Sequence, residues 1–301
     1  MAESLSVRVE NGAELLPEVM AQSNITGEYE AYDSWPGKQL LTLKPADAEG
    51  TSVISSRGMG DYSESFQEDR QNNLTPDDQE EFYTGMPDEL ACKYRFDLLA
   101  GTTIQGAAEL HVMLDSDRED LDGLMITAIL IDVSDQGTFP VFAPTEENGG
   151  GVAAKELDLH YLFDNSPDDG LLNLYDFDQI KKAKQVISFA WTDLQNPGCG
   201  KDSSEYVFQD PGLISGVEQE YTFYFLPTVY TVAEGHHLEL ILTTWDPYRV
   251  QLDAWFTLDG SLETYLDADT YSYNMTVNNE SLELVLPTGT GDPDWLEQWA
   301  E

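Results

Sequence analysis

The chain has 301 residues, of which 41% are hydrophobic and 11% aromatic, so it is long enough and apolar enough to bury a substantial core. It carries 57 acidic residues against 14 basic ones, which gives a formal net charge of -43. Such a field repels phosphate backbones and anionic lipid surfaces, so the composition argues against partners that are nucleic acids or membranes. It favours a solubilising surface, cationic partners or a habitat of high salt, where carboxylate repulsion is screened.

The N-terminus and the cysteines predict a protein of the reducing cytoplasm. Met1–Ser6 contains neither the cationic nor the apolar region of a signal peptide, and nowhere do 18 apolar residues follow one another. Cys92 and Cys199 are far apart and belong to no CxxC or Cys/His motif. We therefore expect two free thiols, and neither a disulfide, a metal nor another cofactor.

Alternating apolar and polar residues predict β-strands along most of the chain. Thr103–Leu114 places its apolar residues on one face and Gln105, Glu109 and His111 on the other, as in a half-buried antiparallel strand. Leu124–Val133 is apolar on both faces, which predicts a central strand of a sheet that is covered twice. Similar runs recur at Lys38–Leu43, Cys92–Leu99, Gln185–Trp191, Gln219–Leu226, His236–Trp245, Asp269–Val277 and Ser281–Leu286.

The last two of these runs flank Val277–Glu280, whose asparagines tolerate the positive φ angles of tight turns. We therefore predict a terminal hairpin with Leu282, Leu284 and Leu286 as its buried row. Helical patterns are sparse: a weak one covers Asp176–Lys184, and a short C-terminal helix is expected within 292–301.

Many short strands with turn residues between them indicate an all-β protein. We predict one jelly-roll β-sandwich of the galactose-binding-domain type over residues 1–301, with two long acidic insertions at 58–90 and 143–184. Connections of that length are typical of lids, binding loops or disordered excursions.

The sequence contains no complete hydrolytic site, because no serine lies in a G-x-S-x-G turn. The four histidines, His111, His160, His236 and His237, are interpreted as structural, and the adjacent pair would point to opposite faces of a strand and could not readily bind one metal ion. Asp115–Gly123 is the best calcium candidate, although a solvated acidic turn explains it more simply. We therefore predict no catalytic, cofactor-binding or metal-binding residue in this chain.

Three stretches, taken in order, resemble the C-terminal domain of X-Pro dipeptidyl-peptidases and the related cocaine esterases and α-amino-acid ester hydrolases. They are Leu16–Asn24 with Tyr32–Pro36; Ile104–Gly106 leading through Leu110–Asp117 to Leu130–Val133; and Ala233–Leu240 with Trp245–Pro247. The resemblance extends from about Leu16 to about Pro287, and the two insertions match nothing in it.

The resemblance implies a non-catalytic jelly-roll domain that packs beside an upstream α/β-hydrolase module and helps to shape its cleft. The parent activity it implies is release of N-terminal X-Pro dipeptides or a related ester or amide hydrolysis. None of the family's triad residues maps onto this chain, and the sequence leaves a homo-oligomer open. The alternative is a stand-alone carbohydrate- or protein-binding β-sandwich, in which exposed Trp and Tyr side chains would form the binding surface.

Overall fold

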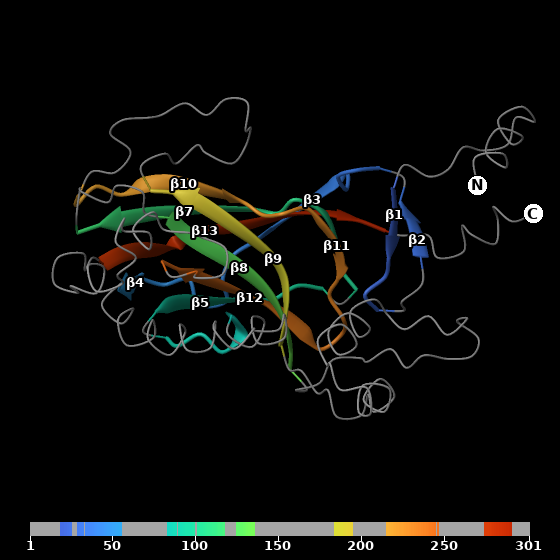
Figure 1. The fold of residues 1–301 in the computed structure, drawn as a ribbon, viewed down its shortest axis with the longest axis horizontal. Helices are drawn as coiled ribbons and strands as arrows, with labels where there is room; N and C mark the ends of the chain where they lie inside the picture. Colours follow the sequence, from blue (N-terminus) through green and yellow to red (C-terminus); the bar gives the residue numbers. More distant parts are fainter. Residues whose placement is uncertain are drawn as a thin grey trace, which may run out of the picture.

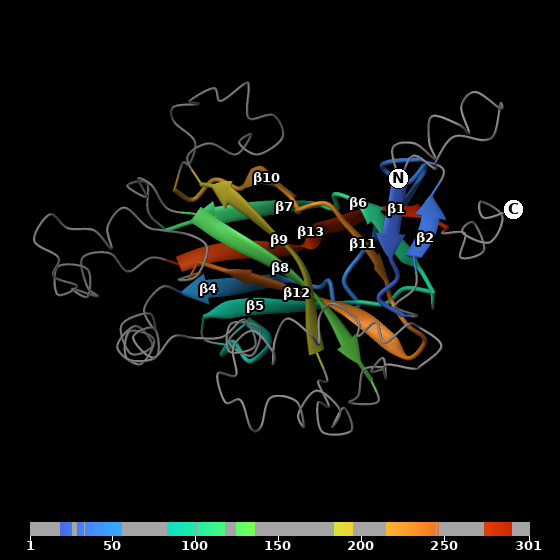
Figure 2. The ribbon, with the colours of Figure 1, turned by 45° about the vertical axis from the view of Figure 1, so that its right-hand side comes forward.

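The computed structural model describes residues 19–25, 29–32, 34–55, 83–88, 90–99, 101–117, 125–135, 184–194, 215–244, 246 and 274–290, and the structural statements below concern these residues. They form three antiparallel sheets, and two of these are stacked face to face (Figures 1 and 2). The third is a two-stranded ribbon of β1 (Val19–Gln22) and β2 (Tyr29–Tyr32) at one end of the stack. The predicted all-β sandwich is therefore confirmed.

The larger sheet is organised around the longest strand, β13 (Asn274–Gly289). On one side β13 pairs with β4 (Thr51–Ser55) along its first half and with β3 (Gln39–Leu43) along its second half. On the other side it pairs with β7 (Glu109–Ser116) and then with β6 (Thr103–Gly106). Outside these, β10 (Gln219–Tyr224) pairs with β7, and β11 (Thr228–Thr231) pairs with β6.

The smaller sheet has the order β5 (Ala91–Phe96), β12 (His236–Thr243), β8 (Met125–Ser134) and β9 (Lys184–Asp193). In the larger sheet, consecutive strands lie end to end as three interrupted strands, β3 with β4, β6 with β7, and β10 with β11. Each stacked sheet is then four strands wide, and the chain passes between the two sheets in the order of a jelly roll. The predicted central position of Leu124–Val133 is confirmed, because β8 lies between β12 and β9.

The core lies between the two stacked sheets and is built from the predicted apolar rows. Leu110, Val112 and Leu114 of β7 face Leu238, Leu240 and Leu242 of β12, and every one of these side chains is at most 1% exposed. Because alternate residues of a strand point to opposite faces, a single row of each strand supplies this interior. Ile126, Ala128 and Leu130 of β8 complete it from the smaller sheet.

The outer face of the smaller sheet is also covered. A short turn within 83–90 places Tyr83, Met86 and Leu90 against Ile129, Ile131 and Ile241, and all of these are buried. This explains why Leu124–Val133 is apolar on both faces. The last residues of the predicted insertion 58–90 are thus part of the folded framework, and Lys184, the last residue of insertion 143–184, is the first of β9.

The predicted terminal hairpin is wrong, because Asn274–Gly289 is one continuous strand. Both of its halves pair with β7 in the same direction, with a bulge at which Asn279–Leu282 lie opposite the single residue Val112. The bulge inserts an odd number of residues, so the buried row passes from Met275 and Val277 to Leu282, Leu284 and Leu286 without leaving the core. The predicted buried row of the second run is confirmed.

The predicted strand Thr103–Leu114 is interrupted, because β6 ends at Gly106 and β7 begins at Glu109. Gly106 has a φ of 132°, and a Cβ there would lie 2.7 Å from the Cβ of Pro36, so only glycine fits. Gln105, which the alternation assigned to a polar face, is buried, and its side-chain amide donates a hydrogen bond to the main-chain carbonyl of Ser34. The segment before β3 therefore lies against the end of β6.

Several predictions fall outside the described residues: the C-terminal helix within 292–301, all of Asp176–Lys184 except its last residue, His160 and Cys199. Four short strands, β1, β2, β4 and β11, had no sequence prediction. The thiol of Cys92 is free and buried. None of the described residues forms a helix with the length and apolarity that crossing a membrane requires.

A paired leucine substitution tests the assignment of inner and outer faces. Leu284 of β13 is fully buried, whereas Leu40 of the adjacent strand β3 is 72% exposed. We expect Leu284→Ala to lower the free energy of unfolding by about 2–5 kcal/mol, as for a buried leucine whose removal leaves a cavity. Leu40→Ala should change it by less than about 0.5 kcal/mol. Equal effects of the two changes in urea denaturation would contradict the assignment.

Candidate functional site: a buried polar cluster at one end of the sandwich

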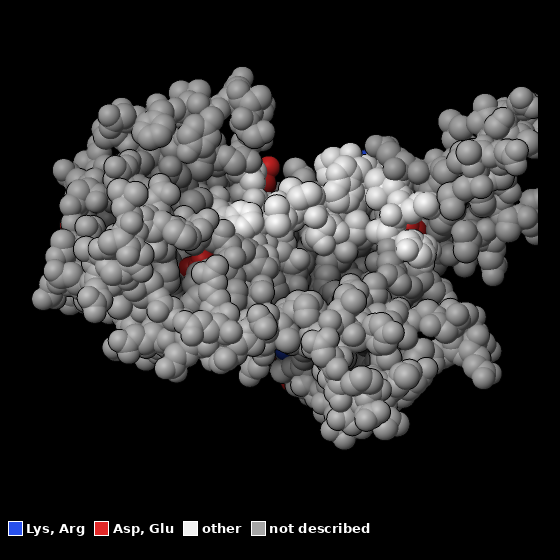
Figure 3. Space-filling model, viewed as in Figure 1, with Lys and Arg blue, Asp and Glu red and all other residues white. Residues whose placement is uncertain are grey.

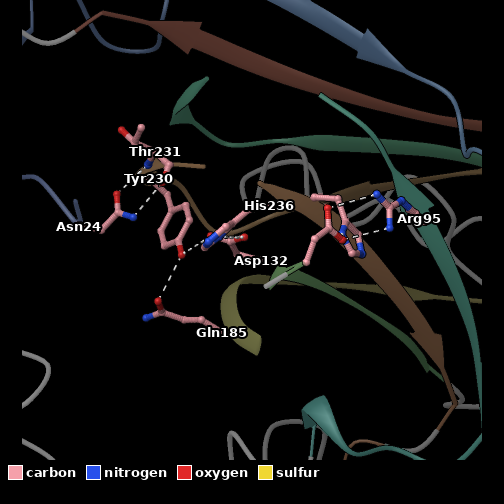
Figure 4. A network of polar contacts seen from close by, with 9 residues as sticks. Asn24, Arg95, Asp132, Gln185, Tyr230, Thr231 and His236 are labelled. Atoms are coloured by element: carbon pink, nitrogen blue, oxygen red, sulfur yellow. Dashed lines mark hydrogen bonds and ion pairs between the residues drawn. The ribbon is translucent and has the colours of Figure 1, made fainter. Parts of the chain in front are cut away.

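A buried carboxylate, imidazole and phenol meet where β8, β12 and β11 come together (Figure 4). Asp132 Oδ1 lies 3.0 Å from His236 Nδ1, and Asp132 Oδ2 lies 2.8 Å from the hydroxyl of Tyr230. The Asp132 side chain is 2% exposed and that of His236 is 5% exposed. Burial raises the pKa of Asp132 above its ordinary value, although the hydrogen bond from Tyr230 and the charge of His236 act in the opposite direction.

The cluster continues on both sides of Tyr230. Gln185 Oε1, at the start of β9, lies 3.2 Å from the Tyr230 hydroxyl. The next residue, Thr231, is bound by the side chain of Asn24: Asn24 Nδ2 donates to the Thr231 carbonyl at 2.9 Å, and the Thr231 amide donates to Asn24 Oδ1 at 2.7 Å. The carboxamide thus pairs with the edge of β11 as a neighbouring strand would, and it attaches the β1–β2 ribbon to the sandwich (Figure 4).

A second, more exposed network lies beside the first. His237 Nδ1 is 2.8 Å from Asp135 Oδ1, and Arg95 bridges Asp135 at 3.3 Å and Asp97 at 2.8 Å. Burial acts to raise the pKa of Asp135, but the hydrogen bond from Arg95 and the nearby charge of His237 outweigh it and lower that pKa. The adjacent histidines therefore contact two different carboxylates, as the alternation of strand residues requires.

Two further polar contacts fasten segments to the framework. Tyr83 donates to Asp246 Oδ1 at 2.5 Å, and Thr127 donates to Asp246 Oδ2 at 3.2 Å, so the turn at 83–90 is bound to the smaller sheet. At the other end of the segment before β3, the Gly37 amide donates to the carbonyl of Gln105 at 2.8 Å. These contacts join residues that are far apart in the sequence, with separations of 163 and 119 positions for the two bonds to Asp246.

Several residues that make these hydrogen bonds, called anchor residues below, lie in the stretches that carry the family resemblance. Asn24, Asp132 and His236 come from the three separate stretches, and the structure brings them into one cluster. Gln105 and Asp246 belong to the same stretches and form the other two anchors. The resembling stretches thus supply residues to the contacts that fasten the β1–β2 ribbon, the segment before β3 and the turn at 83–90 to the sandwich.

An Asp–His pair is also the acid–base half of a hydrolytic triad, but burial argues against that role here. With both side chains at most 5% exposed, neither can reach a substrate from solvent. The geometry instead suits a structural pair, in which the carboxylate orients the imidazole and accepts the phenol hydrogen bond. Sequence reasoning singled out His236 but did not pair it with Asp132, and Asn24 and Asp132 were named only within the stretches that carry the resemblance. No sequence signal pointed to the contacts of Tyr230 and Gln185.

The remaining candidates are dispersed. His111 lies half-buried on the outer face of β7, 3.2 Å from Thr222 Oγ1 and 3.5 Å from Glu109 Oε2. Of the calcium candidate Asp115–Gly123, only 115–117 lie in the described part, where Asp117 accepts hydrogen bonds from the Asn274 amide at 2.9 Å and from its side chain at 2.6 Å. In the described ranges, no three His, Cys, Asp or Glu side chains gather to hold a metal ion.

No protein-family profile matches the sequence, and no curated protein matches it significantly. Solved structures do match the fold. An aminopeptidase from a marine sediment Thaumarchaeota archaeon matches with a TM-score of 0.53 and 12% identity, over 96% of this chain and 43% of the aminopeptidase. An α-amino acid ester hydrolase matches with a TM-score of 0.50 and 14% identity, over 92% and 41% of the two chains. A CocE/NonD family hydrolase from Staphylococcus aureus gives 0.47 and 10% identity, over 95% and 45%.

The chain therefore has a β-sandwich fold that also occurs within hydrolases, and it spans about two fifths of the length of the solved structures it matches. One of the matched proteins, the α-amino acid ester hydrolase, is of a kind that the sequence resembles, so the resemblance is confirmed at the level of the fold. Identities of 12% and 14% carry no residue roles from those proteins to this one.

Replacing Asn24 with alanine tests its attachment of the β1–β2 ribbon. Asn24→Ala removes two hydrogen bonds to the Thr231 main chain, each with a net contribution of about 1 kcal/mol after exchange with water is counted. We expect faster amide exchange in 19–32 and at Thr231, with exchange in β8 unchanged.

The matched control is Asn278→Ala, which removes only an exposed hydrogen bond from its side chain to Glu218. Equal exchange of 19–32 in the two variants would show that Asn24 does not hold the ribbon.

Proposed function

We propose that this chain is the accessory C-terminal domain of an X-Pro dipeptidyl-peptidase-like serine hydrolase, packed against an α/β-hydrolase module that carries the active site. One observation carries the proposal: two hydrolases match nearly all of this chain, yet this chain spans only about two fifths of each. The remaining three fifths of such an enzyme would then hold the catalytic machinery.

The β1–β2 ribbon supports a docking role because its two faces differ. Tyr32 is 2% exposed on one face, whereas Met20 and Tyr29 are 46% and 57% exposed on the other face. Trp35, which follows the ribbon, is 39% exposed. Large apolar side chains grouped on an outer face are typical of surfaces that another domain covers.

The charge distribution agrees with this proposal. On the face shown in Figure 3, the described residues form a largely uncharged band that extends from the region of β10 to the ribbon, with few acidic or basic side chains. In a chain with a net charge of -43, an uncharged area of this kind is suited to contact with a neighbouring domain.

The finer details of the proposal concern the parent enzyme. The names of the matched proteins, an aminopeptidase and an α-amino acid ester hydrolase, support a parent that acts on amino-acid derivatives. The proposed parent activity is release of N-terminal X-Pro dipeptides or a related ester or amide hydrolysis. The fold is proposed to be of the galactose-binding type. The buried free thiol of Cys92 supports work in the cytoplasm, where thiols stay reduced.

The chain alone should be inactive on X-Pro chromogenic substrates and on simple esters. Its sequence lacks a G-x-S-x-G nucleophile turn, and loss of even one triad member lowers the rate by orders of magnitude. Activity assays on these substrates and labelling with a fluorophosphonate probe measure this directly. Stoichiometric labelling of a serine in this chain would contradict the proposal.

Charged substitutions on the outer face of the ribbon test the docking role. The double change Met20→Asp with Tyr29→Asp should weaken binding to the separately produced catalytic module of the parent enzyme at least tenfold in calorimetric titration, because a buried unpaired carboxylate is costly.

The matched control is Val53→Asp, which is 56% exposed on β4, at the edge of the larger sheet that lies away from β10, and which should leave binding unchanged. A chain that does not bind the catalytic module, but does bind a sugar or another protein, would favour the stand-alone module instead.

A further inference from the structure

If Asp132 is ionised, the polar cluster has fewer hydrogen atoms to donate than it has hydrogen-bond contacts. The Tyr230 hydroxyl is within hydrogen-bond distance of both Asp132 Oδ2, at 2.8 Å, and Gln185 Oε1, at 3.2 Å. Both of those oxygens are acceptors when Asp132 is ionised, and a phenol has only one hydrogen to donate. One contact would then join two oxygens without a proton between them.

A proton on Asp132 removes the conflict. Protonated Oδ2 donates to the Tyr230 oxygen, the Tyr230 hydroxyl donates to Gln185 Oε1, and His236 Nδ1 still donates to Asp132 Oδ1. All three contacts are then satisfied, and no charge is buried on the carboxyl.

The surroundings of Asp132 also favour a neutral carboxyl. Its side chain is 2% exposed, and among the described residues its hydrogen-bond partners are Tyr230 and His236. The nearby cations are held by other carboxylates: Arg95 of β5 by Asp135 and Asp97, and Lys184 of β9 by Glu239 at 2.7 Å. His237 of β12 is directed to Asp135. Burial accordingly raises the pKa of Asp132.

We propose that Asp132 is a proton-binding switch that controls how firmly the β1–β2 ribbon is attached to the sandwich. Tyr230, on the four-residue edge strand β11, covers the carboxyl, and its neighbour Thr231 holds Asn24. When Asp132 loses its proton, hydration of the carboxylate requires β11 to move away from it, and this movement releases Asn24 (Figure 4). The switch is a property of this chain and does not depend on the proposed parent enzyme.

The direction of the pH dependence follows from linkage. The closed state binds the proton more tightly than the open state, so the closed state is favoured at low pH. Opening should increase as pH rises from about 4, the ordinary value for Asp, to the raised pKa of the closed state, by at most about tenfold per pH unit for one proton. Above that pKa the opening should be constant.

The experiment is amide exchange at Thr231 and in 19–32 of the full chain between pH 4 and 9, corrected for intrinsic exchange, with the carboxyl carbon of Asp132 followed by carbon-13 NMR. We expect protection at Thr231 to fall as the Asp132 carboxyl ionises. Asp132→Asn, whose amide can donate to Tyr230 as the protonated carboxyl does, should make protection at Thr231 independent of pH.

Gln185→Leu should move the fall in protection to lower pH, because it removes the acceptor that favours the protonated form. The control Asp88→Asn changes an exposed carboxylate bound to Lys93 and should leave the profile of the unmodified chain intact. An Asp132 carboxylate that stays ionised throughout, with Gln185 turned to donate its nitrogen or with His236 carrying the proton, would overturn the proposal. So would protection at Thr231 that does not follow the Asp132 titration.

Discussion

The larger sheet depends on one strand that has to keep a single face toward the core over sixteen residues. β13 pairs with β3 and β4 on one side and with β6 and β7 on the other. A one-residue slip of its register would therefore turn its apolar side chains out of the core and disturb its pairing on both sides. The bulge solves this problem by an odd shift of register between Asn278 and Glu283. Asn279 at the bulge is itself buried and accepts a hydrogen bond from Tyr94 of the opposite sheet at 3.0 Å, which links the two sheets at that point.

In the middle of the sandwich apolar packing holds the strands together, and at one end the hydrogen bonds of the polar cluster do so. An edge strand as short as β11 buries little, and its open side would attract another chain. Here that side is occupied at Thr231 by the carboxamide of Asn24, while the Tyr230 side chain extends inward to Asp132. Buried hydrogen bonds of this kind add directional specificity, because they are satisfied in only one arrangement of the strands.

Sequence reasoning predicted the parts of the fold that depend on local alternation. The buried rows of β7 and of the second half of β13 follow from period-two patterns, and the doubly apolar run of β8 correctly indicated a strand covered on both faces. The turn signal at Asn278 and Asn279 was misread, because asparagine suits a bulge that buries a hydrogen-bonded amide as well as it suits a turn. β11 was missed because four residues are too few to show a pattern. Without β11, the contacts of Tyr230 with Asp132 and Gln185 could not be predicted.

The acidic composition explains why the buried carboxyl has a histidine and a phenol as partners. In the described part of the chain, Lys44, Lys93, Arg95 and Lys184 each bind a carboxylate near the surface. These pairs relieve repulsion among neighbouring acidic groups, and each long cationic side chain used in this way is withdrawn from the interior. A buried carboxyl in such a protein is then neutralised most readily by a proton, because a proton adds no volume and converts an acceptor into the donor that Tyr230 and Gln185 require. The excess of acidic residues and the proton-dependent attachment of the ribbon therefore have the same physical origin.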